Sequence, residues 1–192
     1  MFIALTGGIG CGKSAALECF AQCGFRIADA DRICHRFYED QDRCRAVIER
    51  FPQVADSCGN IDRRKLGNIV FRDESVLKWL EDLIAPFLAD ELEKLKKDPV
   101  DTVIEVPLLF EKDMQNYFDL AVCVWSPFAL RRQRLAARNW DHAECSRRER
   151  LQWDPDRKLA ESDFGIINAG SMQMLEEQCR NIAGTIKNEI IK

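Results

Sequence analysis

The chain has 192 residues, of which 46% are apolar and 31% charged, and its net charge is −4. This length suits one domain with a substantial core, and the composition is that of a globular protein rather than a disordered or fibrous one. The acidic balance argues against a broad nucleic-acid surface, and no apolar run approaches the roughly 20 residues of a membrane span.

Short apolar segments alternate with helical ones along the whole chain. Strands are predicted at residues 2–6, 25–28, 101–106, 119–125 and 164–168. Helices are predicted at 13–23, 31–40, 41–51, 62–97, 128–138 and 171–191, with helix or turn at 154–163. Gly24 should end the first helix, Pro86 should kink or split the long one, and Ser171 should cap the last.

This alternation predicts a fold class. Five strands separated by helices favour an α/β protein in which a five-stranded parallel sheet is covered by helices on both faces. The right-handed crossover rule then brings the carboxyl ends of the strands, and any ligand, to one edge of the sheet.

The first strand leads into the motif G-G-I-G-C-G-K-S, residues 7–14, which fits the pattern of a phosphate-binding loop. Glycines let backbone N–H groups turn inward around a phosphate, and the following helix adds its positive N-terminal end. Lys13 supplies a cation for the outer phosphates of ATP, and the Ser14 hydroxyl is suited to holding Mg²⁺. The motif therefore predicts nucleotide binding.

A motif that the sequence lacks excludes one class of nucleotide-binding protein, the GTPases. A GTPase would carry N-K-x-D to read guanine, and no such tetrapeptide is present. The D-x-x-G form at 56–59 lies in a polar loop rather than after a strand. A small-molecule kinase is the leading class.

Two carboxylates follow the second predicted strand, at Asp29 and Asp31. A carboxylate at this edge can accept the proton of an acceptor hydroxyl and orient it toward the γ-phosphate. One of the two can instead cap the next helix. We favour Asp31 as the base, although a spacing of two residues does not decide between them.

Two further acidic residues, Glu105 and Glu111, can each be interpreted in a functional or a structural way. Glu105, at the end of the third predicted strand, can support Mg²⁺ or simply reach solvent. Glu111 can orient the acceptor or cap the next segment.

Arginines are concentrated between residues 131 and 157. Arg131, Arg134 and Arg138 are spaced to share one helix face. One interpretation is a solvated face with salt bridges to Asp141, Glu144 or Glu149. The other is a lid that closes over ATP and neutralises the transferring phosphate, with 138–144 as its hinge. A nucleic-acid surface is a third, weaker option.

The nine cysteines show no C-x-x-C pair, and only two histidines are present. Their odd number, and a start that does not resemble a signal peptide, predict reduced, buried thiols in a cytoplasmic protein without a zinc cluster.

Over essentially its whole length the chain resembles the dephospho-coenzyme A kinase family. The resemblance is carried by LTGGIGCGKS, ADADRI, DRRKLGNIVF, EVPLLFE, RRQRLAAR and DFGIINAGS. It implies a P-loop NTPase-like three-layer α/β/α core with a helical substrate-binding region and an arginine-rich lid. It also implies transfer of the ATP γ-phosphate to the ribose 3′-hydroxyl of dephospho-coenzyme A, with ATP and Mg²⁺ as cofactors.

The resemblance also implies boundaries and residue roles. The core would span about 1–57, 100–138 and 154–192, the helical region about 58–99, and the lid about 139–153. Asp31, Lys13 and Arg138 would be catalytic. The nucleotide contacts would be Gly8, Gly10, Cys11, Gly12, Lys13, Ser14, Ala15, Arg134 and Arg138, with Ser14 on the metal. The acceptor contacts would be Thr6, Asp31, Arg63, Leu109 and Glu111.

One departure keeps alternatives open, because the family commonly has His-Pro where this chain has Ala85-Pro86. The alternatives are another nucleotide or small-molecule P-loop kinase, or a nucleotide-binding regulator without transfer activity. We expect a monomer whose partner is the small-molecule acceptor, with neither nucleic acid nor membrane.

Overall fold

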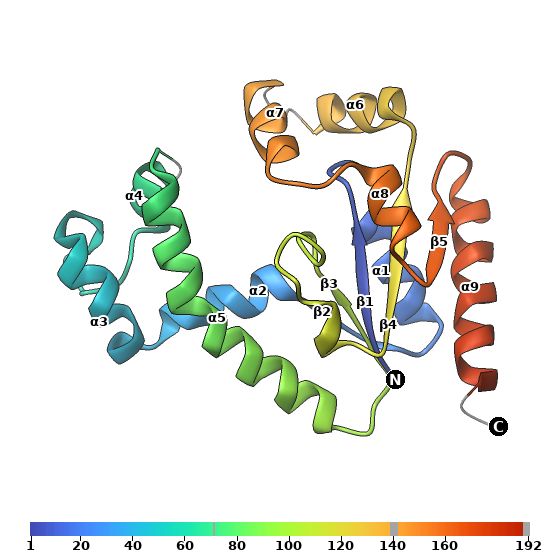
Figure 1. Ribbon diagram of the computed structural model, residues 1–192, viewed down its shortest axis with the longest axis horizontal. Helices are drawn as coiled ribbons and strands as arrows, with labels where there is room; N and C mark the ends of the chain where they lie inside the picture. The colour runs from blue at the N-terminus through green and yellow to red at the C-terminus, as the bar shows by residue number, and fades with distance from the viewer. Residues whose placement is uncertain (71, 139–141, 190–192) are drawn as a thin grey trace. The chain divides into compact units, whose positions relative to one another are not determined.

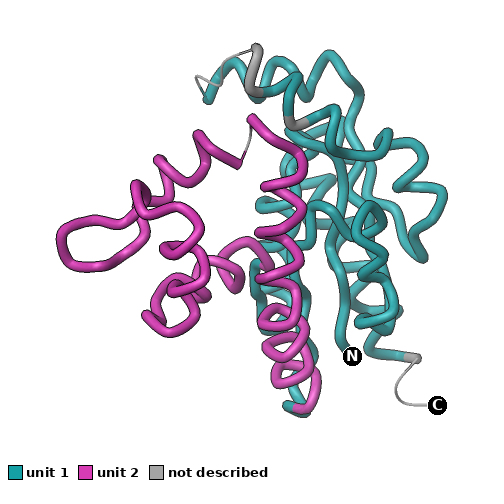
Figure 2. The backbone as a smooth tube through the Cα atoms, turned by 60° about the vertical axis from the view of Figure 1, so that its left-hand side comes forward, with its two compact units in different colours: residues 1–29, 98–192 teal, residues 30–97 magenta. Residues whose placement is uncertain are grey.

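The computed structural model describes residues 1–70, 72–138 and 142–189. Two compact units make up the chain: unit 1 consists of residues 1–29 and 98–192, and unit 2 of residues 30–97 (Figure 2). Within the described ranges, none of the helices has the length and apolar character needed to cross a bilayer.

Unit 1 contains a five-stranded sheet, as the alternation of segments predicted. The strands are β1 (Phe2–Gly7), β2 (Arg26–Asp29), β3 (Thr102–Glu105), β4 (Leu120–Trp125) and β5 (Phe164–Ile167). Their order is β2-β3-β1-β4-β5, and every pairing is parallel. Since β1 lies between β3 and β4, the loop that follows it leaves the middle of the carboxyl edge, where ligands of such sheets bind.

Helices cover both faces of this sheet. The helices of unit 1 are α1 (Lys13–Gln22), α6 (Phe128–Ala137), α7 (His142–Arg150), α8 (Pro155–Ala160) and α9 (Met172–Glu189), with the short 3₁₀ helix η3 (Gln115–Tyr117). Ser171 caps α9 as predicted, because its hydroxyl accepts the Met174 amide proton at 3.3 Å. Gly24 ends α1 as predicted, with φ at +86°.

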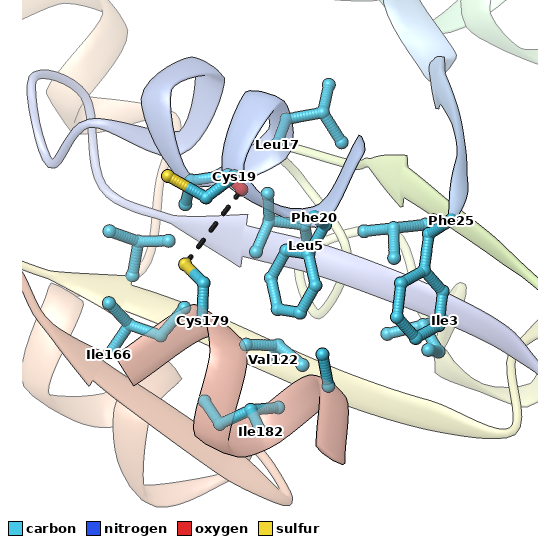
Figure 3. Packing of buried hydrophobic residues seen from close by; sticks show 14 of the residues in the cluster. Ile3, Leu5, Leu17, Cys19, Phe20, Phe25, Val122, Ile166, Cys179 and Ile182 are labelled. Carbon is cyan, nitrogen blue, oxygen red and sulfur yellow. Dashed lines mark hydrogen bonds between the residues drawn. The ribbon is translucent and has the colours of Figure 1, made fainter. Parts of the chain in front are cut away.

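One sheet face packs against α1 and α9 (Figures 1 and 3). Leu5 and Val122 of the sheet meet Phe20 of α1 and Ile182 of α9 in a single apolar cluster. Side chains alternate along a strand, so Cys123, the residue after Val122, points to the opposite face of the sheet. The core thus fixes the helix that starts at the phosphate loop against the centre of the sheet.

Burial raises the pKa values of five core thiols, those of Cys11, Cys19, Cys44, Cys123 and Cys179. For Cys123 and Cys179 the pKa rises from 9.0 to about 12. All nine cysteines are free. These thiols stay protonated in the folded protein at pH values where the unfolded chain has lost the proton.

The protein should therefore lose stability in alkali. Below the unfolded pKa of 9.0 these thiols add no pH dependence. Above it, each should lower the free energy of unfolding by about 1.4 kcal/mol per pH unit until its folded pKa is reached. Urea unfolding under reducing conditions at about pH 8 and about pH 10.5 measures this. The variant Cys58→Ser, which replaces an exposed thiol, should show the same loss of stability between the two pH values as the wild type. A wild type with equal free energies of unfolding at the two pH values would contradict the prediction.

Unit 2 is helical and has its own aromatic core. Its helices are α2 (Ala30–His35), α3 (Gln41–Arg50), α4 (Arg63–Val70) and α5 (Glu74–Lys97), with the 3₁₀ helices η1 (Arg36–Glu39) and η2 (Pro52–Val54). Phe37 contacts Phe87 edge-on at 5.8 Å, and Val47 and Leu66 are buried with them.

Of the two outcomes predicted at Pro86, a kink or a split, the split does not occur. Helix α5 continues through Pro86, and the run is instead divided between Val70 and Glu74. The division is set by Asp73, whose carboxylate accepts the Ser75 amide proton at 2.9 Å and so starts a new helix. Hydrogen bonds from Ser75 also hold the Asp73 pKa below its usual value.

Candidate active site

The loop from β1 to α1 has the backbone that its glycines allow. Gly10 and Gly12 have φ values of +77° and +97°, in the left-handed region. A Cβ at Gly12 would also lie 2.2 Å from Asn168 Nδ2. Both the positive φ and this steric overlap therefore exclude a larger residue at Gly12. The turn is closed by the Cys11 amide, which donates to Gly8 O at 3.2 Å.

Most amides of this loop are available to an anion. Among the residues that the structure describes, the amides of Gly10, Gly12, Lys13 and Ser14 have no protein hydrogen-bond acceptor. Successive amides of this kind, at the positive end of a helix of ten residues, form a binding site for phosphate.

Lys13 lies within this loop rather than in solvent. Its side chain is buried, and Nζ donates to Gly7 O at 3.1 Å and to Gly8 O at 3.2 Å. These two carbonyls hold the ammonium group beside the amides, so the cation is positioned before any ligand arrives. The lysine supplies positive charge where the outer phosphates of a nucleotide would lie.

Oxygen ligands gather at the mouth of the loop. Ser14 Oγ lies 3.3 Å from Glu105 Oε2, and Asp29 is the register partner of Glu105 across β2 and β3. No group of three His, Cys, Asp or Glu side chains suited to a metal is found in the described ranges. Magnesium fits such a place, because it is commonly bound by one or two protein oxygens together with phosphate and water.

A polar network beneath the loop fixes its shape. Asn168 Nδ2 donates to Cys11 O at 2.9 Å, and Arg134 Nη1 donates to the same carbonyl at 3.3 Å. Arg134 also bonds Ser126 Oγ at 2.8 Å and Asn168 Oδ1 at 3.1 Å. Arg134 is among the nucleotide contacts that the sequence predicts, whereas Ser126 and Asn168 are not. Their only sequence signal is that each follows the end of a strand.

The three arginines predicted to share one helix face have three different surroundings. Arg131 is buried, donates to Ile9 O at 3.4 Å and pairs with Glu149 at 3.2 Å. Arg134 is half-buried under the loop, and Arg138 is exposed at the end of α6. A uniformly solvated face is therefore wrong for the first two, although the salt bridge to Glu149 is present. Part of the predicted hinge at 138–144 falls on residues 139–141, which lie outside the described residues.

Glu111 is part of a buried ion pair. Its Oε1 accepts from Lys158 Nζ at 2.7 Å and from the Trp153 amide at 2.7 Å. Lys158 is fully buried and also donates to Pro107 O at 2.6 Å. Burial lowers the Lys158 pKa, and the bond to Glu111 partly offsets this. The pair ties the segment after β3 to α8, a link that the sequence did not reveal.

The remaining predicted site residues are placed as follows. Thr6 and Leu109 are fully buried in unit 1, and Thr6 Oγ1 has no protein hydrogen-bond partner in the described part of the chain. Ala15 lies in the first turn of α1. Asp31 lies in the first turn of α2, two residues beyond the end of β2, and Arg63 begins α4. Both belong to unit 2.

Comparison with known proteins gives consistent matches. A family model described as dephospho-CoA kinase matches residues 1–174. The dephospho-CoA kinase of Aquifex aeolicus is 34% identical over 185 residues, covering 94% of each chain. The structure of TT1252 from Thermus thermophilus matches with a TM-score of 0.82 and 30% identity, covering 97% of this chain and 96% of that one. Dephospho-CoA kinase from Campylobacter jejuni matches with a TM-score of 0.73 and 26% identity over 97% of each chain.

Proposed function

This chain belongs to the dephospho-CoA kinase family, and from that premise we propose which of its residues carry each part of the reaction. The enzyme transfers the terminal phosphate of ATP to the ribose 3′-hydroxyl of dephospho-CoA, giving CoA and ADP. The observation that carries the assignment is the loop at residues 7–14, whose unbonded amides and buried lysine suit a triphosphate.

ATP binds with its outer phosphates against the amides of Gly10, Gly12, Lys13 and Ser14. Lys13 neutralises the charge that develops on the transferring phosphate, an electrostatic contribution that is large in such reactions. Arg138 contributes a second cation from the end of α6. Arg134 acts by bonding Cys11 O and Asn168, so its effect on nucleotide binding passes through the shape of the loop.

Mg²⁺ fits the oxygens of Ser14 and Glu105. When bound, the ion would neutralise charge on the β- and γ-phosphates. Glu105 then has the metal-supporting role rather than the solvent-facing one, because its carboxylate bonds the Ser14 hydroxyl.

Asp31 accepts the proton of the ribose 3′-hydroxyl and aims the oxygen at the γ-phosphorus. It lies two residues beyond the end of β2, and the last residue of that strand, Asp29, is in register with Glu105. Asp29, the last residue of β2, supports the metal side of the site. The different positions of the two carboxylates support this proposed division of roles, because Asp29 ends a strand and Asp31 lies in the first turn of a helix.

The acceptor is held by Thr6, Arg63, Leu109 and Glu111. The buried Thr6 hydroxyl and Glu111 Oε2 have no protein hydrogen-bond partner in the described ranges, so both retain capacity for a polar ligand. The region at 58–99 is proposed to serve the coenzyme moiety and the segment 139–153 to act as the lid, of which 139–141 lie outside the described residues. We further propose a cytoplasmic monomer, consistent with nine unbridged cysteines.

A coupled assay with a panel of acceptors tests this function. Dephospho-CoA should give ADP and CoA in equal amounts, and adenosine or common nucleoside monophosphates should give little ADP. We expect the pantetheine arm and the ribose 3′-hydroxyl together to define the acceptor, with Ala85 in the place of the family's histidine. Faster turnover of a nucleoside monophosphate would indicate another kinase of this fold. Tight ATP binding without acceptor-dependent ADP would indicate a regulator.

A further inference from the structure

One amide of the phosphate loop differs from its neighbours. The Ile9 amide donates to the side-chain oxygen of Gln152 at 3.0 Å, across 143 positions of sequence. The next amides, at Gly10 and from Gly12 to Ser14, have no protein acceptor in the described ranges. Gln152 thus presents a carbonyl oxygen to the rim of a loop whose other amides are suited to phosphate oxygens.

The backbone around Gln152 is anchored by other contacts. The amide of Trp153 donates to Glu111 at 2.7 Å, and its ring stacks on Phe110 with centroids 5.7 Å apart. The Gln152 amide donates to Glu149 O at 3.1 Å. The Gln152 side chain is half-buried. It can therefore leave the loop by rotating about its own bonds, without displacing the segment that carries it.

Ile9 is also where helices α6 and α7 meet the loop. Its carbonyl accepts from Arg131, which pairs with Glu149 of α7 at 3.2 Å. Its side chain packs in a small cluster with Leu135 of α6 and Cys145 of α7. Any ligand that takes the Ile9 amide from Gln152 therefore acts on the residue through which α7 contacts the loop.

We infer that Gln152 is a positioning residue that stands in for a nucleotide phosphate oxygen at the Ile9 amide, so that ATP must displace it to bind. The inference rests on the proposed binding of ATP at this loop. A neutral amide oxygen is a weaker acceptor than a phosphate oxygen, so the exchange favours the nucleotide. Without nucleotide, the contact holds the loop in its binding conformation. Because ATP must break it, the contact weakens ATP binding by the strength of one hydrogen bond.

Two substitutions test this inference by the direction of their effects. Gln152→Ala removes the competitor and should lower the dissociation constant of MgATP roughly three- to tenfold, the factor expected for one neutral hydrogen bond. Gln152→Glu has nearly the same shape but places a carboxylate at the amide. Gln152→Glu should raise the dissociation constant of MgATP by about tenfold or more, because a carboxylate bonds the Ile9 amide more strongly than a neutral amide oxygen does and also repels phosphate.

A purely structural contact predicts different results. If Gln152 only braced the loop, Gln152→Ala would bind MgATP more weakly, and Gln152→Glu would bind it about as the wild type does. Either result overturns the inference, as does a Gln152→Ala variant with unchanged affinity. Calorimetric titration of the full chain with MgATP, without acceptor, measures the constants, and thermal melts confirm folding. If the alanine variant fails to fold, the glutamate variant decides alone.

Gln178 offers a matched control. Its Oε1 accepts the amide proton of Ile167, the last residue of β5, at 2.8 Å, so the bond is of the same kind. Gln178→Ala and Gln178→Glu should leave MgATP affinity unchanged. Wild-type conversion of dephospho-CoA in the same preparation separates the two proposals. A wild type that binds MgATP but makes no CoA contradicts the proposed function. If the wild type makes CoA and both Gln152 variants bind MgATP as tightly as it does, only the present inference is contradicted.

Discussion

Replacing Asp31 with asparagine is expected to lower kcat roughly 10²–10⁴-fold, the usual contribution of a general base. Asparagine keeps the shape of the side chain and its capacity to accept a hydrogen bond, but it cannot take the proton of the ribose hydroxyl. Binding of MgATP should stay near the wild-type level, because Asp31 acts on the acceptor. Steady-state kinetics with dephospho-CoA, together with titration of MgATP, separate these two effects.

Asp29→Asn is the matched control for this prediction. Asp29 ends β2, in register with Glu105, and is proposed to act on the metal side. Its substitution should raise the Mg²⁺ concentration needed for half-maximal activity, and excess Mg²⁺ should restore much of the rate. If Asp31→Asn keeps full turnover while Asp29→Asn loses it irrespective of Mg²⁺, the two roles are reversed.

The second large effect is expected from Lys13→Met. Methionine fills most of the lysine volume but removes the charge from the loop, so kcat should fall roughly 10²–10³-fold, as when one preorganised electrostatic donor is lost. Affinity for MgATP should fall as well. The bonds from Nζ to Gly7 O and Gly8 O are lost too, and for this reason the variant's melting temperature must be measured beside its kinetics.

Lys187→Met provides the comparison for Lys13→Met. Lys187 is exposed and donates to Cys23 O at 2.7 Å, at the other end of the same helix α1. It makes the same kind of bond without a proposed ligand, so its substitution should leave kcat and MgATP affinity unchanged. Equal activity of the Lys13 variant and the wild type would remove Lys13 from the reaction.

The arrangement of strands was predictable because it depends on local patterns. Apolar runs such as residues 2–6 and 119–125 can only be buried strands beside helices, and parallel order follows from the helices between them. The long run at 62–97 was harder. Pro86 is a strong helix breaker by propensity, yet apolar packing in unit 2 keeps α5 continuous, and the actual break depends on the capping by Asp73.

The site was only partly predictable, for a similar reason. The loop at 7–14 is a contiguous motif, so its residues could be identified one by one. Its supports come from far along the chain: Asn168 is 157 positions from Cys11, and Gln152 is 143 positions from Ile9. Neither belongs to a local pattern, and Lys158 has the sequence context of a surface residue although it is fully buried. Only the folded sheet brings Asn168 and Gln152 to the loop, and Lys158 to Glu111.

Crystallographic location of ATP in the presence of Mg²⁺ tests the central claim most directly. We predict that the outer phosphates contact the amides of Gly10, Gly12, Lys13 and Ser14 and the ammonium of Lys13, with the Ser14 hydroxyl on the metal ion. A triphosphate located at any other part of the chain, with those amides still unbonded, would contradict the account.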